Sequence, residues 1–149
     1  MGDTMTFEQM NLDKNIIQAL HTLGYEKPLP VQEKVIPNIL LGTDCIVKSR
    51  TGSGKTASFA IPIIQNLEID ERSPQALVLT PTRELALQIQ QDFDRIGTFK
   101  KIKTLPIFGK QPFKFQKEDL KQRCHVVIGT PGRVLDHLQQ QTLDPSKIR

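Results

Sequence analysis

A short stretch of the chain combines two glycines, a lysine and several hydroxyl side chains. Its residues are Ser49, Arg50, Thr51, Gly52, Ser53, Gly54, Lys55 and Thr56. The two glycines can take backbone angles closed to other residues, so that successive N–H groups turn inward and form a nest for an anion. In such a loop the lysine reaches the β- and γ-phosphates of a nucleotide and the threonine hydroxyl ligates Mg²⁺. The stretch therefore predicts a phosphate-binding loop.

The flanks of this loop support that prediction. Asp44–Lys48 is typical of a short buried strand, and Thr56–Ile61 is typical of the start of a helix whose positive dipole end would face the anion. Strand, loop and helix in this order are the context that a phosphate-binding loop requires. The first position is Ser49, where the strict pattern has glycine. The alternative is a glycine-rich surface turn that happens to precede a lysine.

The elements that would position the loop alternate from Asp44 onward. The predicted strands are Cys45–Lys48, Ala76–Thr80, Lys103–Phe108 and His125–Gly129. The predicted helices are Lys55–Asn66, Glu84–Ile96, Phe113–Gln122 and Gly132–Gln140. Four strand–helix pairs predict an α/β fold, a parallel doubly wound sheet with helices on both faces, in which ligands collect at the carboxyl ends of the strands.

Residues 1–43 have a different, helical pattern. Apolar residues recur at helical spacing from Leu12 to Leu23, and Gly24 ends that helix. A second helix is expected from Val31 to Leu41, bent by Pro37. We therefore expect a helical region at 1–43 packed on a nucleotide- and nucleic-acid-binding domain at 44–149.

Composition limits the class of protein. The 149 residues carry a net charge of +4, and the two cysteines form no Cys-x-x-Cys pair, as expected in a reducing compartment. No apolar run approaches the ~18 residues of a membrane span. We expect a cytoplasmic protein without a membrane partner.

The positive charge is concentrated in the second half. Arg95–Arg123 holds nine Lys and Arg against Glu118 and Asp119, with four phenylalanines interleaved. Such a stretch can be the electrostatic footprint of a nucleic-acid surface. It can equally be a solvated helix face with its phenylalanines in the core. The two interpretations remain open at this point.

Three other strand-end loops carry groups suited to phosphate oxygens. They are Pro81-Thr82-Arg83, Gly109-Lys110-Gln111 and Thr130-Pro131-Gly132-Arg133. Hydroxyls, backbone N–H groups and guanidinium groups at such turns bind a nucleic-acid backbone rather than its bases. Simple helix capping by Thr82 and Thr130 is the alternative. Arg133 could also pair with Glu84 and brace the two loops.

These loops, taken in order, resemble the first RecA-like domain of a DEAD-box ATP-dependent RNA helicase. Phe7 and the run Gly24–Pro28, which leads to Gln32, resemble the Q motif. Ser49–Thr56 resembles motif I, Pro81–Ala86 motif Ia and Thr130–Arg133 motif Ib. The resemblance covers nearly the whole chain.

The resemblance implies the ligands ATP, Mg²⁺ and RNA. It assigns nucleotide binding to Phe7, Tyr25, Lys27, Gln32 and the loop 49–56, with Lys55 and Thr56 catalytic and Thr56 on the metal. It assigns binding of single-stranded or duplex RNA backbone to Pro81, Thr82, Arg83, Gly109, Lys110, Thr130, Pro131, Gly132 and Arg133. Gln32 offers a donor and an acceptor that match the edge of adenine. Phe7 either stacks on adenine or anchors the core.

The sequence departs from the family pattern in three places. Leu29-Pro30 replaces a hydroxyl-plus-apolar pair, and Lys110 stands where a second glycine is common. No apolar strand in this chain ends in an acid, and the Asp-Glu-Ala-Asp strand, the Ser-Ala-Thr motif and the arginine finger are absent. The resemblance thus implies an N-terminal part of a helicase, truncated after the fourth strand–helix unit. We expect this part to be deficient in hydrolysis.

The same truncation would remove the sheet neighbours of Ile46-Val47. We therefore expect the chain to recruit the missing C-terminal part or a strand-exchanged copy. The stretch 108–125 resembles the bacterial branch that acts on ribosomal RNA. A small-molecule P-loop kinase and a non-enzymatic RNA-binding fragment are the alternative functions.

Overall fold

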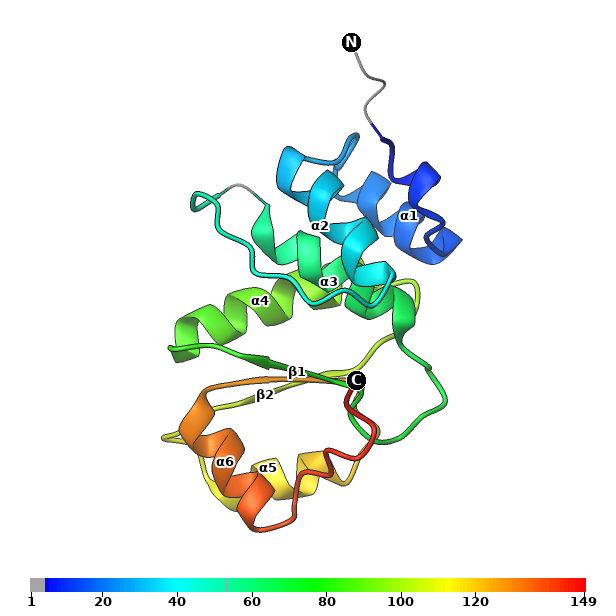
Figure 1. The fold of residues 1–149 in the computed structure, drawn as a ribbon. Coiled ribbons are helices and arrows are strands. Elements are labelled where there is room, and N and C mark those ends of the chain that lie inside the picture. Colours follow the sequence, from blue (N-terminus) through cyan, green and yellow to red (C-terminus); the bar gives the residue numbers. More distant parts are fainter. Residues whose placement is uncertain (1–4, 53) are drawn as a thin grey trace. The chain divides into compact units, whose positions relative to one another are not determined.

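The computed structural model of the chain describes residues 5–52 and 54–149 and forms two compact units (Figure 1). The first unit runs to Asn66 and includes Arg95–Lys100. The second comprises Leu67–Asp94 and Lys101–Arg149. The phosphate-binding loop thus shares a unit with the N-terminal helices. The sequence-based division at residues 43 and 44 stays a prediction.

The first unit is helical. Its elements are η1 (Glu8–Met10), α1 (Lys14–Thr22), α2 (Pro30–Leu40) and α3 (Lys55–Asn66). Ile16 and Leu20 on α1 are fully buried, as their helical spacing predicts. Gly24 follows α1 with a φ of 81°, a conformation that suits glycine and ends the helix. Helices α2 and α3 pack against each other.

Lys100 holds the end of α3 in this unit. Its ammonium donates to the carbonyl oxygens of Ile64 and Gln65 at 2.8 and 3.0 Å and lies 3.2 Å from an Asp13 carboxylate oxygen. A cation at a helix C-terminus satisfies the last carbonyls and complements the helix dipole. One cation of the basic stretch therefore has a structural role.

The predicted strand Cys45–Lys48 is wrong. Residues 43–49 have no regular secondary structure, and the Ile46 side chain is fully exposed. A strand exists only through ladder hydrogen bonds to a neighbour. In the described part of the chain, the sheet has three strands and none of them pairs with this segment. The expectation that Ile46-Val47 would have no sheet neighbour is confirmed.

The second unit contains that sheet. Its elements are β1 (Ala76–Leu79), α4 (Arg83–Ile96, to Asp94 in this unit), β2 (Thr104–Ile107), α5 (Phe113–Leu120), β3 (Val126–Gly129) and α6 (Pro131–Gln139). The strands are parallel in the order β1-β3-β2. Helices α5 and α6 lie on one face of the sheet and α4 on the other (Figure 1). The predicted parallel α/β fold with helices on both faces is confirmed, with three strands instead of four.

The core of this unit lies between the sheet and the helices α5 and α6. It is formed by Ile107, Cys124, Val127, Val134 and Leu143. Burial raises the pKa of the Cys124 thiol to about 12, against a smaller opposing effect of its hydrogen bond to a backbone carbonyl. The thiol is therefore a packing group and not a nucleophile.

The register of the strands aligns their carboxyl ends. Leu79 and Ile107 both lie opposite Gly129 on the central strand. The loops that follow β1, β2 and β3 therefore leave the sheet at one edge. A Cβ atom on Gly129 would lie 2.3 Å from the carbonyl oxygen of Ile107, which accepts a hydrogen bond from the Thr130 N–H at 2.9 Å. Only glycine fits this close approach.

We predict that Gly129→Ala lowers the free energy of unfolding by about 3 kcal/mol, because the new methyl group must displace the backbone of β2. Chemical denaturation monitored by circular dichroism measures the change. Gly132→Ala is the matched control, since a Cβ there would meet no atom within 4 Å. Equal stability of the two variants would contradict the role given to Gly129.

Candidate nucleotide and nucleic-acid sites

At its two glycines, the predicted phosphate-binding loop has the backbone conformation that its sequence predicts. Gly52 and Gly54 have φ values of 79° and 87°, in the region that favours glycine. Helix α3 begins at Lys55, and the first N–H groups of a helix have no acceptor within the helix, the arrangement by which helix starts bind anions. Ser53 lies outside the described residues.

The Lys55 side chain closes the loop. The Lys55 ammonium donates to the carbonyl oxygen of Ser49 at 2.6 Å, so the end of the loop is fastened to its beginning. Arg50 and Thr51 are exposed, and Thr56 is half-buried at the start of α3. A phosphate group bound in this loop would have to compete with the Ser49 carbonyl for Lys55.

Gln32 connects α2 to this loop. Its side chain is 0% exposed. The amide oxygen accepts from the Leu29 N–H at 2.9 Å, and the amide nitrogen donates to the Gly54 carbonyl at 3.3 Å. A Cβ atom on Gly54 would lie 2.6 Å from that nitrogen and 2.8 Å from the Leu29 side chain. The structure thus brings Gln32 to the phosphate-binding loop. The Leu29 side chain cannot form the hydrogen bond that a hydroxyl residue could form at this position, but the backbone N–H of Leu29 is still paired, with Gln32.

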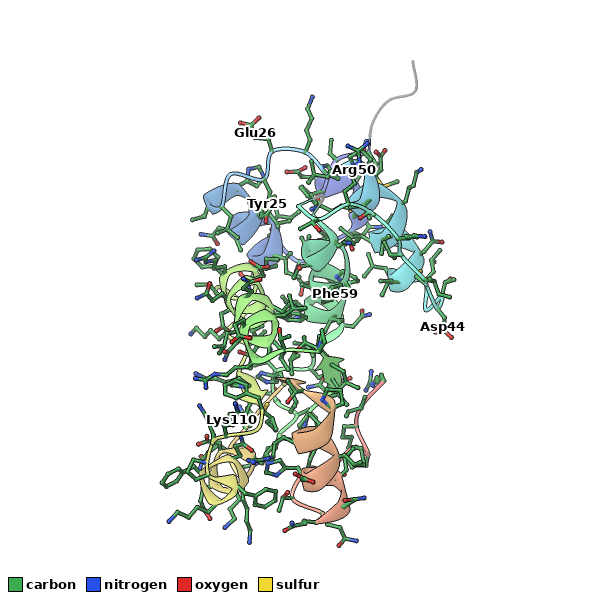
Figure 2. All side chains as sticks on the ribbon, turned by 90° about the vertical axis from the view of Figure 1, so that its left-hand side faces the viewer. Tyr25, Glu26, Asp44, Arg50, Phe59 and Lys110 are labelled. Carbon is green, nitrogen blue, oxygen red and sulfur yellow. The ribbon has the colours of Figure 1, made fainter. Side chains whose placement is uncertain are left out.

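The other predicted nucleotide-binding residues differ in how far they are buried. Phe7 is 2% exposed, which supports the core-anchor interpretation over stacking on a base. Tyr25 is half-buried and Lys27 is exposed. Figure 2 shows Tyr25 and Arg50 at the same end of the first unit, with Asp44 away from both. The assignment of Tyr25 and Lys27 to the nucleotide stays a prediction.

The donor set at the loop fits Mg²⁺ only in part. Thr56 offers one hydroxyl oxygen. Among the residues that the structure describes, no group of three His, Cys, Asp or Glu side chains could hold a metal ion. Mg²⁺ demands six oxygen ligands. A metal ion at Thr56 would therefore need phosphate oxygens and water as its other ligands.

Thr82 and Thr130 both lie at the start of a helix, but only one of them caps it with its side chain. The Thr82 hydroxyl accepts from the Leu85 N–H at 3.2 Å, so Thr82 caps α4, as the capping interpretation predicts. Thr130 is at the N-cap position of α6 but makes no capping hydrogen bond through its side chain. Its hydroxyl is therefore not committed to the helix end.

Arg83 and Lys110 take unusual positions beside these loops. The Arg83 guanidinium lies 4.9 Å from the centre of the buried Phe108 ring, a cation–π contact. Lys110 has a φ of 64° and is exposed on the loop that leads into α5 (Figure 2). A left-handed conformation is costly for a residue with a side chain, so the position favours glycine. This explains physically why a second glycine is common here.

The predicted pairing of Arg133 with Glu84 is wrong for the described part of the chain. One Arg133 nitrogen, Nη1, donates to the Gln111 carbonyl at 2.8 Å and to the Gln116 amide oxygen at 3.1 Å. Its Nε lies 3.6 Å from an Asp136 carboxylate oxygen. Arg133 does brace two loops, but the partner is the backbone of the loop after β2. Arg133 bonds to these groups because α6 places it beside the start of α5.

Sequence reasoning missed two buried polar residues at this edge, Gln116 and His137. Gln116 donates to the Phe108 carbonyl at 2.9 Å, and its amide oxygen lies 2.8 Å from His137 Nε2. His137 Nδ1 lies 2.7 Å from the Thr142 hydroxyl. The available signal was the spacing of Arg133 and His137, four residues apart and thus on one helix face.

The basic stretch fits neither of its two interpretations throughout. Phe108 is core, whereas Phe115 on α5 is 60% exposed with the Lys114 ammonium 5.3 Å from its ring centre. Phe99 belongs to the first unit and is partly exposed. The phenylalanines therefore divide between packing and surface.

Comparison with known proteins identifies the family. The family model described as DEAD/DEAH box helicase matches residues 29–148. The chain belongs to this family. It is 53% identical over 142 residues to the ATP-dependent RNA helicase DbpA of Bacillus subtilis (strain 168) and 41% identical over 138 residues to the DEAD-box ATP-dependent RNA helicase CshA of Geobacillus kaustophilus. These matches cover 95% and 93% of this chain but 30% of either relative.

Solved structures agree. A DEAD box protein from the hyperthermophile Methanococcus jannaschii superposes with a TM-score of 0.92 and 40% identity, over 99% of this chain and 40% of that one. A variant of Dbp5 from S. cerevisiae bound to RNA and ADP BeF3 superposes with a TM-score of 0.84 and 29% identity, over 97% of this chain and 36% of that one. The fold is that of a RecA-like helicase domain, of which this chain is a part. No helix in the described residues is both long and apolar enough to cross a bilayer.

His137 predicts a pH dependence of stability. Burial lowers its pKa, the nearby Arg133 lowers it further, and Asp136 acts weakly in the opposite direction. The unfolded chain then binds the proton more readily, so this contribution to stability is complete above about pH 6.5 and is lost as the pH falls from there through the lower pKa of the folded state. Unfolding free energy between pH 7.5 and 5.5 should fall more in the wild type than in His137→Gln. The same pH dependence in the wild type and in His137→Gln would contradict a buried, neutral His137 imidazole.

Proposed function

We propose that this chain is the ATP- and RNA-binding part of an ATP-dependent RNA helicase. One observation carries the proposal: the amide of the buried Gln32 lies on Gly54 of the phosphate-binding loop, so the base-reading and phosphate-binding groups belong to one site. The names of the relatives, ATP-dependent RNA helicases, support the same activity.

On the nucleotide side, Gln32 would exchange its hydrogen bonds to Leu29 and Gly54 for hydrogen bonds to the edge of adenine, and the loop 49–56 would hold the phosphates. The open N–H groups at the start of α3 and the Lys55 ammonium would neutralise their charge. Mg²⁺, when bound with the nucleotide, would neutralise the charge that develops on the phosphates, with Thr56 as a ligand. Arg50 and Thr51 are exposed and would be accessible to the bound phosphates.

On the RNA side, three loops at one edge of the sheet would bind consecutive parts of a sugar–phosphate backbone. They are supplied by Pro81–Arg83, Gly109–Gln111 and Thr130–Arg133. The uncommitted Thr130 hydroxyl, the first N–H groups of α6 and the Lys110 ammonium are the groups that phosphate oxygens would meet. Such contacts do not read the base sequence.

We further propose that the chain binds nucleotide and RNA without turning ATP over. Phosphoryl transfer needs acidic groups on the metal and the attacking water as well as an arginine on the developing charge, and an arginine finger alone is worth about 10³–10⁵ in rate. Ribosomal RNA as the target rests on the resemblance of 108–125 to the bacterial branch. The exposed Ile46 supports pairing of Asp44–Lys48 with a strand from a longer chain or from a second copy.

The first test is nucleotide selectivity. ADP should bind more tightly than GDP by isothermal titration calorimetry, because a buried amide that matches adenine leaves polar groups unpaired with guanine. Gln32→Ala should remove this preference. Gln18→Ala, at an exposed glutamine on α1, should leave it unchanged. Equal affinity of the wild type for ADP and GDP would contradict selection of adenine by Gln32.

The second test uses Lys110. Lys110→Gly should raise the free energy of unfolding by about 1 kcal/mol, since glycine takes a φ of 64° without strain. The same change should weaken binding of single-stranded RNA and reduce its logarithmic salt slope by about 1, because one phosphate contact is lost. Fluorescence anisotropy at several salt concentrations measures both effects. Lys14→Ala on α1 is the control, and an unchanged slope for Lys110→Gly would remove Lys110 from the RNA site.

A further inference from the structure

A closed polar network lies beneath the RNA-side loops of the second unit. Its centre is Gln116, a glutamine on α5 that is 3% exposed. The amide nitrogen donates to the Phe108 carbonyl, at the point where the chain leaves β2. The amide oxygen accepts a hydrogen bond from Arg133 and lies within hydrogen-bond distance of His137 Nε2, and both residues are on α6. One side chain therefore bonds to the backbone before one loop and to the helix that follows the other.

Arg133 completes the connection between the two loops. Its Nη1 divides its hydrogen bonds between the Gln116 amide oxygen and the Gln111 carbonyl, at 3.1 and 2.8 Å. The guanidinium also lies 5.9 Å from the centre of the Phe113 ring. The Arg133 guanidinium thus holds the loop Gly109–Gln111 to the first turn of α6, and the Gln116 amide oxygen holds that guanidinium in place.

His137 secures Gln116 from the other side. Its ring stacks on Phe113 with the ring centres 4.1 Å apart and the planes within 9°. The Gln116 amide oxygen can only accept, so a neutral imidazole carries its proton on Nε2 and donates it to Gln116. The Thr142 hydroxyl lies within hydrogen-bond distance of both Nδ1 and the His137 carbonyl. In the described residues no buried side-chain nitrogen or oxygen is left without a partner. Loss of Gln116 would leave the Phe108 carbonyl and the His137 Nε2–H without these partners, and an unpaired buried polar group is costly.

We propose that Gln116, held by His137, is a positioning residue for RNA binding: it fixes the loop Gly109–Gln111 against the turn Thr130–Arg133, so that both loops present their donors to one RNA backbone. This inference rests on the proposed RNA site and adds to it a residue that touches no RNA. Loops held in their binding geometry lose less conformational freedom on binding, and that saving appears as affinity. The phosphate-binding loop has no part in the network.

The test compares RNA and nucleotide affinity in the same variants. Gln116→Leu removes the amide with little change in volume, and His137→Phe keeps a ring against Phe113 while removing the bond to Gln116. Each should weaken single-stranded RNA by about tenfold, the equivalent of one lost hydrogen bond, and leave ADP affinity unchanged. Gln122→Leu, the same change at an exposed glutamine, is the control. All affinities are measured well below each variant's Tm.

A double-mutant cycle gives the second readout. If His137 acts through Gln116, then His137→Phe in the Gln116→Leu background should weaken RNA binding no further. RNA affinity within twofold of wild type for both Gln116→Leu and His137→Phe would overturn the inference, as would full additivity in the cycle. If Gln116→Leu does not fold, His137→Phe decides alone. Wild-type chain that binds no RNA would refute the proposed function itself, whereas RNA binding that depends on Lys110 but not on Gln116 would refute only this inference.

Discussion

The pairing of Gly129 with both of its neighbours is the constraint on which the second unit depends. Leu79 and Ile107 lie opposite this residue, so three parallel strands end at the same level. The missing side chain allows the Ile107 carbonyl to approach and to accept the Thr130 N–H. This register, in a sheet of parallel strands, makes neighbours of three loops that are far apart in the sequence. The proposed RNA site is a consequence of strand register, and its chemistry is then supplied by loop residues.

Each unit uses a buried glutamine to hold a loop. Gln32 on α2 donates to the Gly54 carbonyl, and Gln116 on α5 donates to the Phe108 carbonyl. In both cases the amide oxygen is occupied by donors, so the glutamine has no polar atom unpaired. An amide can donate and accept at once without carrying charge. Burying it at such a junction therefore costs less free energy than burying a charged group. Nucleotide and RNA would therefore meet loops that are already shaped.

The sequence predicted the elements of both units well and their polar contacts poorly. Alternation of apolar runs and turns gave the helices and the three strands of the sheet to within a few residues, because burial and turn chemistry are local properties. It failed at Cys45–Lys48, where strand formation depends on a neighbour and not on the segment itself. Arg133 was assigned the wrong partner and Gln116 was missed, since both depend on which residues α5 and α6 bring together.

The most direct test of the account maps both ligands on the same sample by amide chemical-shift changes in NMR. The account predicts that ADP shifts the amides of the loop 49–56 and of the residues around Gln32. Single-stranded RNA should shift the amides of the three strand-end loops, centred on Gly109–Gln111 and Thr130–Arg133. Two separate sets, each saturating with its own ligand, are the expected result. RNA-induced shifts confined to the loop 49–56, or to the exposed face of α5 with the strand-end loops unchanged, would contradict the account.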